Sequence, residues 1–243
     1  MANHLQDPVE QFGQRVLFED NHLIIVNKQS SEIVQGDKTG DVTLADLVRE
    51  YIRVKYRKPG AAFIGVAHRI DRPVSGLVIF ARTSKGLARI NDLLKRHQLK
   101  KKYWAVVGGR PPQEEDSLEH YLRKNEKQNK SHVCDPAAPG AKKALLNYRL
   151  LAMGDRYSLL EVELLTGRHH QIRAQLAAIG CPIKGDLKYG FARSNPDGSI
   201  HLHARSLSFT HPVSGQEVHV VAPVPGGDSL WKHFETSKGV GGW

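Results

Sequence analysis

Short apolar runs recur along the chain and predict a protein rich in β-strands. We expect strands at residues 16–18, 23–26, 77–80, 103–107, 145–151, 157–165, 201–209 and 217–221. Over residues 160–164 apolar and acidic positions alternate, which assigns Leu160 and Val162 to a buried face and Glu161 and Glu163 to a solvated one. This alternation predicts an antiparallel sheet with one face in water.

Three further segments repeat their apolar residues at helical spacing. They cover residues 44–52 behind an N-cap at Thr43, a stretch that starts at Ser84 and runs into the basic turn 100–102, and residues 169–179 before Gly180. These helices interrupt the strands without the regular alternation of a parallel βαβ fold. The pattern therefore predicts the α+β class, with flanking helices on a largely antiparallel mixed sheet.

The chain of 243 residues contains no internal repeat and no obvious linker, so a single domain is expected. We place this domain at residues 15–235, between a flexible N-terminal segment, residues 1–14, and a flexible tail, residues 236–243. No apolar stretch is long enough to span a membrane and no secretion signal is apparent. We expect a cytoplasmic protein and take a monomer as the default.

The net charge and the number of cysteines limit the kinds of function that the protein can have. Lysine and arginine number 35 against 25 aspartates and glutamates, and the resulting net charge of +10 favours a polyanionic partner such as nucleic acid. Cys134 and Cys181 lack C-x-x-C partners, which excludes a disulfide framework and a cysteine-rich zinc site. His201 and His203 share a strand face but no H-E-x-x-H accompanies them, so no metal is expected. P-loop and dinucleotide-binding motifs are absent, and no cofactor is predicted.

Chemistry is indicated most strongly in the segment His68-Arg69-Ile70-Asp71-Arg72, where cations bracket one carboxylate in a turn before an apolar strand. Two interpretations are open. Asp71 can cap the turn, or the loop can hold an ionised and therefore nucleophilic carboxylate in an electropositive cleft.

Two other segments carry candidate residues. In residues 165–173, Arg173 lies beside an apolar helical stripe, where it can either extend to solvent or reach sideways into a cleft as an ion-pair partner for Asp71. In residues 101–107, Tyr103 is either a core aromatic or a platform on which a nucleobase stacks beside basic residues.

Taken in order, these segments resemble the RluA-type family of RNA pseudouridine synthases. The matching residues are His68-Arg69-Ile70-Asp71 with Ser75-Gly76-Leu77 for the family's H-R-L-D loop, Lys101-Lys102-Tyr103 for its K-x-Y strand, and Gly167-Arg168-His169-His170-Gln171-Ile172-Arg173 for G-R-x-H-Q-I-R. Departures are Ile70 for the commoner Leu, Pro73-Val74 where a threonine is usual, and Gln29 in place of Pro. No room is expected before Val16 for the small S4-type RNA-binding domain of many relatives.

The resemblance implies the pseudouridine synthase fold with a central cleft, and an isomerase that converts uridine in tRNA or rRNA to pseudouridine without a cofactor. It implies that Asp71 is the catalytic nucleophile, that Tyr103 packs on the target uracil and that Arg173 pairs with Asp71. Three routes stay open for Asp71: attack on C1′, addition to C6, or removal of a sugar proton.

The target carbon is inaccessible in a stacked helix, so the uridine is expected to flip out, with Arg69 filling the vacated space. Unchanged RNA binding and turnover in an Arg69→Ala variant would exclude that role. Contacts to RNA are expected from the basic region 123–143 and from His68, Arg69, Arg72, Lys100, Lys101, Lys102, Arg168, His170 and Gln171.

Two functions from other classes compete with this one. The first is an RNA-binding protein that has lost catalysis, against which the intact Asp71, Tyr103 and Arg173 count. The second is a hydrolase that pairs Asp71 with a second acid. Glu161 and Glu163 are the candidates for that acid, but their alternation is typical of a solvated strand face.

Overall fold

The computed structural model describes residues 8–36 and 40–237, which form two compact units. The first unit contains the described residues through Leu99 together with Leu207–Ala222, and the second contains Lys100–Ser206 and the described residues from Pro223. The chain passes between them within strand β10 (Leu202–Thr210). The expectation of one domain over residues 15–235 stays a prediction.

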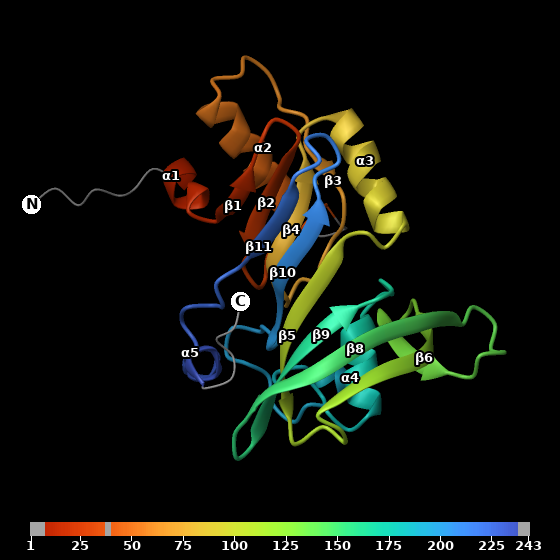
Figure 1. The fold of residues 1–243 in the computed structure, drawn as a ribbon. Helices are drawn as coiled ribbons and strands as arrows, with labels where there is room; N and C mark the ends of the chain where they lie inside the picture. The colour runs from red at the N-terminus through yellow and green to blue at the C-terminus, as the bar shows by residue number, and fades with distance from the viewer. Residues whose placement is uncertain (1–7, 37–39, 238–243) are drawn as a thin grey trace, which may run out of the picture. The chain divides into compact units, whose positions relative to one another are not determined.

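The first unit combines a small antiparallel sheet with three helices (Figure 1). Its elements are α1 (Pro8–Gly13), β1 (Val16–Glu19), β2 (Leu23–Lys28), α2 (Leu44–Lys55), β3 (Gly65–Val66), β4 (Ser75–Ala81), α3 (Ser84–Lys95) and β11 (Glu217–Val221). Strand β2 pairs with β1 and β4, and β3 with β4. Every residue of β4 is buried. Helix α3 approaches so closely that a Cβ on Gly65 would lie 2.8 Å from Leu87 Cδ2.

The second unit is a mostly antiparallel sheet with helices on both faces (Figure 1), and the first residues of β10 belong to it beside β5. Its elements are β5 (Lys100–Gly108), β6 (Glu115–Asn125), β7 (Lys130–Cys134), β8 (Lys142–Met153), β9 (Tyr157–Leu164), α4 (Gln171–Ala178), the 3₁₀ turn η1 (Leu187–Tyr189) and α5 (Ser229–Thr236). The strand order is β5-β9-β8-β6-β7.

Neighbouring residues of β5 send their side chains to opposite faces of this sheet. Trp104 belongs to a core that includes Trp231 and Phe234 of α5. Tyr103 faces the other side, where Ala174 of α4 packs against Leu122 and Ala144. The α+β class with a mostly antiparallel sheet is confirmed.

The eight expected strands are all present, whereas the two-residue strand β3, the polar strand β6 and its partner β7 escaped prediction. Only Leu118 and Leu122 of β6 are buried, so its hydrophobic pattern is too sparse to predict a strand. Residues 100–102 begin β5 instead of ending a helix, because α3 stops at Lys95. Residues 8–13, within the segment expected to be flexible, form α1, and Thr236 ends α5. Residues 1–7 and 238–243 lie outside the described residues.

The N-cap predicted at Thr43 is confirmed as a reciprocal capping box. The Asp46 amide donates to Thr43 Oγ1 over 3.1 Å, and the Thr43 amide donates to Asp46 Oδ2 over the same distance. In the described part of the chain no helix is both long and apolar enough to cross a membrane.

Candidate active site

Asp71 lies in the first unit, in the loop between β3 and β4, and is half-buried. Its carbonyl accepts a hydrogen bond from the Val74 amide over 3.0 Å, which closes a tight turn. The ammonium of Lys28 donates to the carbonyls of Arg72 over 3.1 Å and of Val74 over 2.7 Å. The backbone that follows Asp71 is therefore fixed from inside the unit.

Lys28, which binds the backbone of this loop from strand β2, is the main residue whose role sequence analysis missed. It ends strand β2, is 1% exposed, and makes a third bond to the Gln29 carbonyl over 2.8 Å. Burial lowers the pKa of Lys28 to about 7, against the opposing influence of the Glu32 and Asp71 carboxylates. A lysine at the end of the apolar run 23–26 is the only sequence signal for it.

Three residues predicted to bind RNA share the loop with Asp71. His68 is half-buried and its Nε2 accepts a hydrogen bond from the Ile79 amide over 3.1 Å. Arg69 and Arg72 are exposed, and Arg72 pairs with Asp41 over 2.9 Å. The loop thus groups one carboxylate with two exposed guanidinium groups, while contact with RNA stays a prediction.

Arg173 lies in the second unit, on α4, and is buried at 5% exposure. Its Nε donates to Asp186 Oδ2 over 2.7 Å and its Nη2 to Asp186 Oδ1 over 2.8 Å. The interpretation that Arg173 extends to solvent is therefore wrong. Its pairing with Asp71 would join residues of the two units and stays a prediction.

Tyr103 and the three lysines beside it lie on β5. Tyr103 is buried, opposite Val162 of β9. Lys100 is exposed, whereas burial lowers the pKa of Lys101, whose Nζ would lie 3.9 Å from a Cβ on Gly167. The structure thus brings the K-x-Y strand against the start of the G-R-x-H-Q-I-R segment.

Within that second segment, two of the residues predicted to bind RNA are held by internal bonds. His170 is buried with φ 51°, and its Nδ1 lies 3.0 Å from the Tyr189 hydroxyl. The buried Gln171 accepts from the Arg168 amide over 2.9 Å and donates to the Leu145 carbonyl over 2.9 Å. Arg168 itself is exposed, and its Nε donates to the Lys143 carbonyl. These bonds shape the loop, and contact of its residues with RNA stays a prediction.

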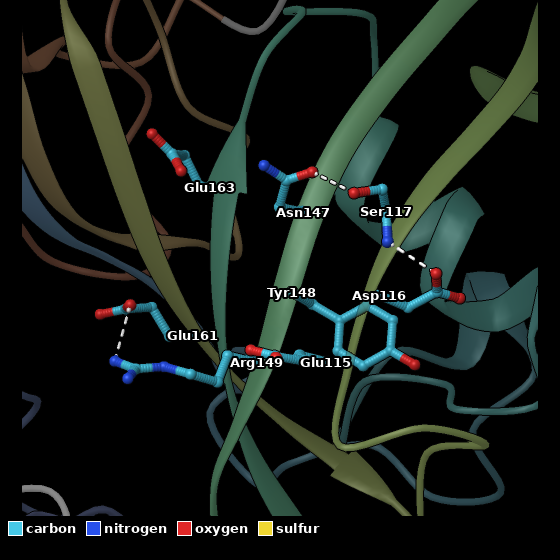
Figure 2. Close-up of a pocket in the computed structure, with 8 residues that line it drawn as sticks. All are labelled: Glu115, Asp116, Ser117, Asn147, Tyr148, Arg149, Glu161 and Glu163. Carbon is cyan, nitrogen blue, oxygen red and sulfur yellow. Dashed lines mark hydrogen bonds and ion pairs between the residues drawn. The ribbon is translucent and has the colours of Figure 1, made fainter.

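The prediction that Glu161 lies on a solvated strand face is wrong. Glu161 is 6% exposed, and its Oε1 lies 3.0 Å from Lys102 Nζ and 3.3 Å from Arg149 Nη2. Figure 2 shows this carboxylate turned toward Arg149. Glu161 and Glu163 both line a cavity of about 530 Å³. Two cations offset the charge of Glu161, which allows its burial.

No group of three metal-ligating side chains occurs among the residues that the structure describes. His201 is hydrogen-bonded within the second unit, where its Nδ1 lies 3.0 Å from Asn195 Nδ2.

Comparison with known proteins agrees with these motifs. The family model described as RNA pseudouridylate synthase matches residues 22–178, more than half of the chain. An uncharacterized RNA pseudouridine synthase of Synechocystis sp. is 31% identical over 90% of the chain and 66% of its own length. Ribosomal large subunit pseudouridine synthase D of Xanthomonas campestris pv. campestris is 32% identical over 86% of the chain and 66% of its own length. The chain thus spans about two thirds of these relatives.

A solved structure supports the fold. Human RNA pseudouridylate synthase domain containing 4 superposes with a TM-score of 0.76 at 20% identity, covering 93% of this chain and 94% of that one. The chain belongs to the RluA-type family of RNA pseudouridine synthases. By class it is an RNA-modifying isomerase.

Proposed function

We propose that the protein isomerises uridine in tRNA or rRNA to pseudouridine, with Asp71 as the nucleophile. The observation that carries this proposal is the Asp71 loop, in which the buried Lys28 binds the carbonyls of Arg72 and Val74. Fixed backbone on one side of a half-buried carboxylate supports a preorganised reactive group.

The reaction breaks the N1–C1′ bond of uridine and forms a bond from C5 to C1′. C5 releases its proton to solvent and N1 gains one, so the conversion is redox-neutral. Asp71 serves the step that detaches or rotates the uracil, and it must be ionised in each of the three routes considered above.

The substrate is a folded RNA from which the target uridine flips out. Ribosomal RNA is favoured over tRNA by relatives that are named as ribosomal large subunit enzymes. Exposed basic residues on β6 and β8 are suited to phosphate contacts and include Arg123, Lys124, Lys142 and Lys143. Arg69, exposed beside Asp71, is suited to fill the space that the uridine leaves.

The test is tritium release from 5-[³H]uridine-labelled large-subunit rRNA and tRNA transcripts, with the wild type and Asp71→Asn. We expect release by the wild type, loss of release by about a thousandfold or more in the variant, and unchanged RNA affinity. Tight RNA binding without release by the wild type would favour an RNA-binding protein without catalysis. Equal release by the two proteins would exclude Asp71 as the nucleophile.

A further inference from the structure

Arg173 is held in the second unit by two side chains to which sequence analysis gave no role. The Asp186 carboxylate contacts it through two bonds of 2.7 and 2.8 Å, and its guanidinium carbon lies 5.1 Å from the centroid of the Tyr189 ring. We propose that Asp186 and Tyr189 are positioning residues, which fix the orientation of Arg173 for uridine isomerisation. This inference rests on the proposed function.

The geometry of the Arg173–Asp186 pair restricts rotation. Two parallel N–H···O bonds join a planar guanidinium to a planar carboxylate, so turning either group breaks both bonds. Arg173 is 5% and Asp186 1% exposed, and water cannot easily replace those bonds. Among the described residues Asp186 has no second ion-pair partner within 4.0 Å.

The Tyr189 ring is itself held in place, so it can restrict the position of the Arg173 guanidinium beside it. Its hydroxyl accepts a hydrogen bond from the Ser131 amide over 2.9 Å and lies 3.0 Å from His170 Nδ1. The ring is buried and joins the core formed with Ala174 of α4. A cation beside this ring face is attracted by the ring quadrupole.

Asp186 and Tyr189 come from one tight turn. The Tyr189 amide donates to the Asp186 carbonyl over 3.1 Å, which holds the two residues in register. Gly185 precedes them with φ 87°, and a Cβ there would lie 2.8 Å from the Ser199 carbonyl oxygen. Only glycine fits this close approach, so the turn is built to present the carboxylate and the ring together.

Stability alone is a poor explanation for the pair. A buried salt bridge often contributes no more than an apolar pair of similar size, because desolvation of both charges offsets their attraction. A bidentate contact on Arg173, the residue that the family resemblance pairs with Asp71, is better explained by orientation.

The experiment compares kcat and KM for tritium release in Asp186→Asn, Tyr189→Phe and the control Asp155→Asn, which changes an exposed aspartate in the turn between β8 and β9. We expect kcat to fall by about 10- to 100-fold in Asp186→Asn, with KM for RNA within about twofold. Tyr189→Phe keeps the ring but loses the hydroxyl contacts, so a smaller loss of kcat is expected. Asp155→Asn should match the wild type.

A double-mutant cycle separates positioning from a structural role. In the Arg173→Met background, Asp186→Asn should cause no further loss of kcat, and Asp186→Glu in the wild-type background should restore part of it. Losses that add in the cycle, or a fall in kcat that follows only the loss of folded protein, would overturn the proposal. If Asp186→Asn does not fold, Tyr189→Phe with wild-type kcat overturns it. A wild type that releases no tritium defeats the proposed function and this inference together, whereas active wild type with active variants defeats the inference alone.

Discussion

The two units hold their predicted catalytic groups in opposite ways. In the first unit a buried cation, Lys28, binds backbone carbonyls next to Asp71. In the second a buried anion, Asp186, binds the guanidinium of Arg173 directly. One support fixes the path of a loop, and the other fixes the orientation of a side chain.

This difference predicts different consequences of mutation. Loss of Lys28 removes a donor from three backbone carbonyls and should weaken the fold of its unit along with the reaction. Loss of Asp186 leaves the backbone in place and should act mainly on turnover.

The largest effect on stability is expected from Lys28→Met. Three carbonyls lose the Lys28 ammonium, and of these the Arg72 carbonyl keeps the Ser31 amide as a donor. Each group left unsatisfied costs about 1–3 kcal/mol, partly offset because a buried charge is removed. We expect the free energy of unfolding to fall by about 3 kcal/mol, measured by urea denaturation. The matched control is Lys85→Met, at an exposed position of α3. Equal midpoints for the two variants would show that Lys28 does not support the loop.

A moderate effect is expected from Glu161→Gln, which separates isomerisation from hydrolysis. The amide keeps one acceptor for Lys102 and Arg149 but loses the charge, so stability should fall by about 1–3 kcal/mol. Tritium release per folded protein should stay within about twofold of the wild type, because Glu161 has no part in the proposed reaction. A large loss of turnover in the folded variant would instead favour the paired-acid mechanism.

The smallest effect is a pH dependence that belongs to Lys28. In the folded chain its pKa is about 7, whereas its usual value is 10.5. Between these values the unfolded chain binds more protons, so stability from this group rises with pH. Above about pH 7, the free energy of unfolding of the wild type should rise relative to that of Lys28→Met by at most about 1.4 kcal/mol per pH unit. Paired urea titrations measure this gain, and a stability difference independent of pH would show that Lys28 is not shifted.

Much of the fold followed from sequence because its buried strands are apolar runs. Residues of β4 are all buried, so their pattern is continuous. Strand β6 was missed because most of its side chains are exposed: only Leu118 and Leu122 are buried, and pairing of its backbone with β7 and β8 leaves no mark in the sequence.

Residues of the candidate site were predictable where a sequence motif contains them. They were not predictable where their role depends on contacts with residues distant in the sequence. Asp71 and Arg173 stand in dense motifs, whereas Lys28 and Asp186 act through residues 44 and 13 positions away. Glu161 was assigned to solvent because the alternating pattern shows on which side of the strand a residue lies, but not whether that side is covered by other residues. Its burial depends on Lys102 and Arg149, which approach from neighbouring strands.

The most direct test of the central claim is nucleoside analysis of RNA after reaction with the wild type and with Asp71→Asn. With the wild type we expect one pseudouridine gained for each uridine lost and no free uracil, and with the variant no conversion. Free uracil without pseudouridine, or equal pseudouridine from both proteins, would contradict the central claim.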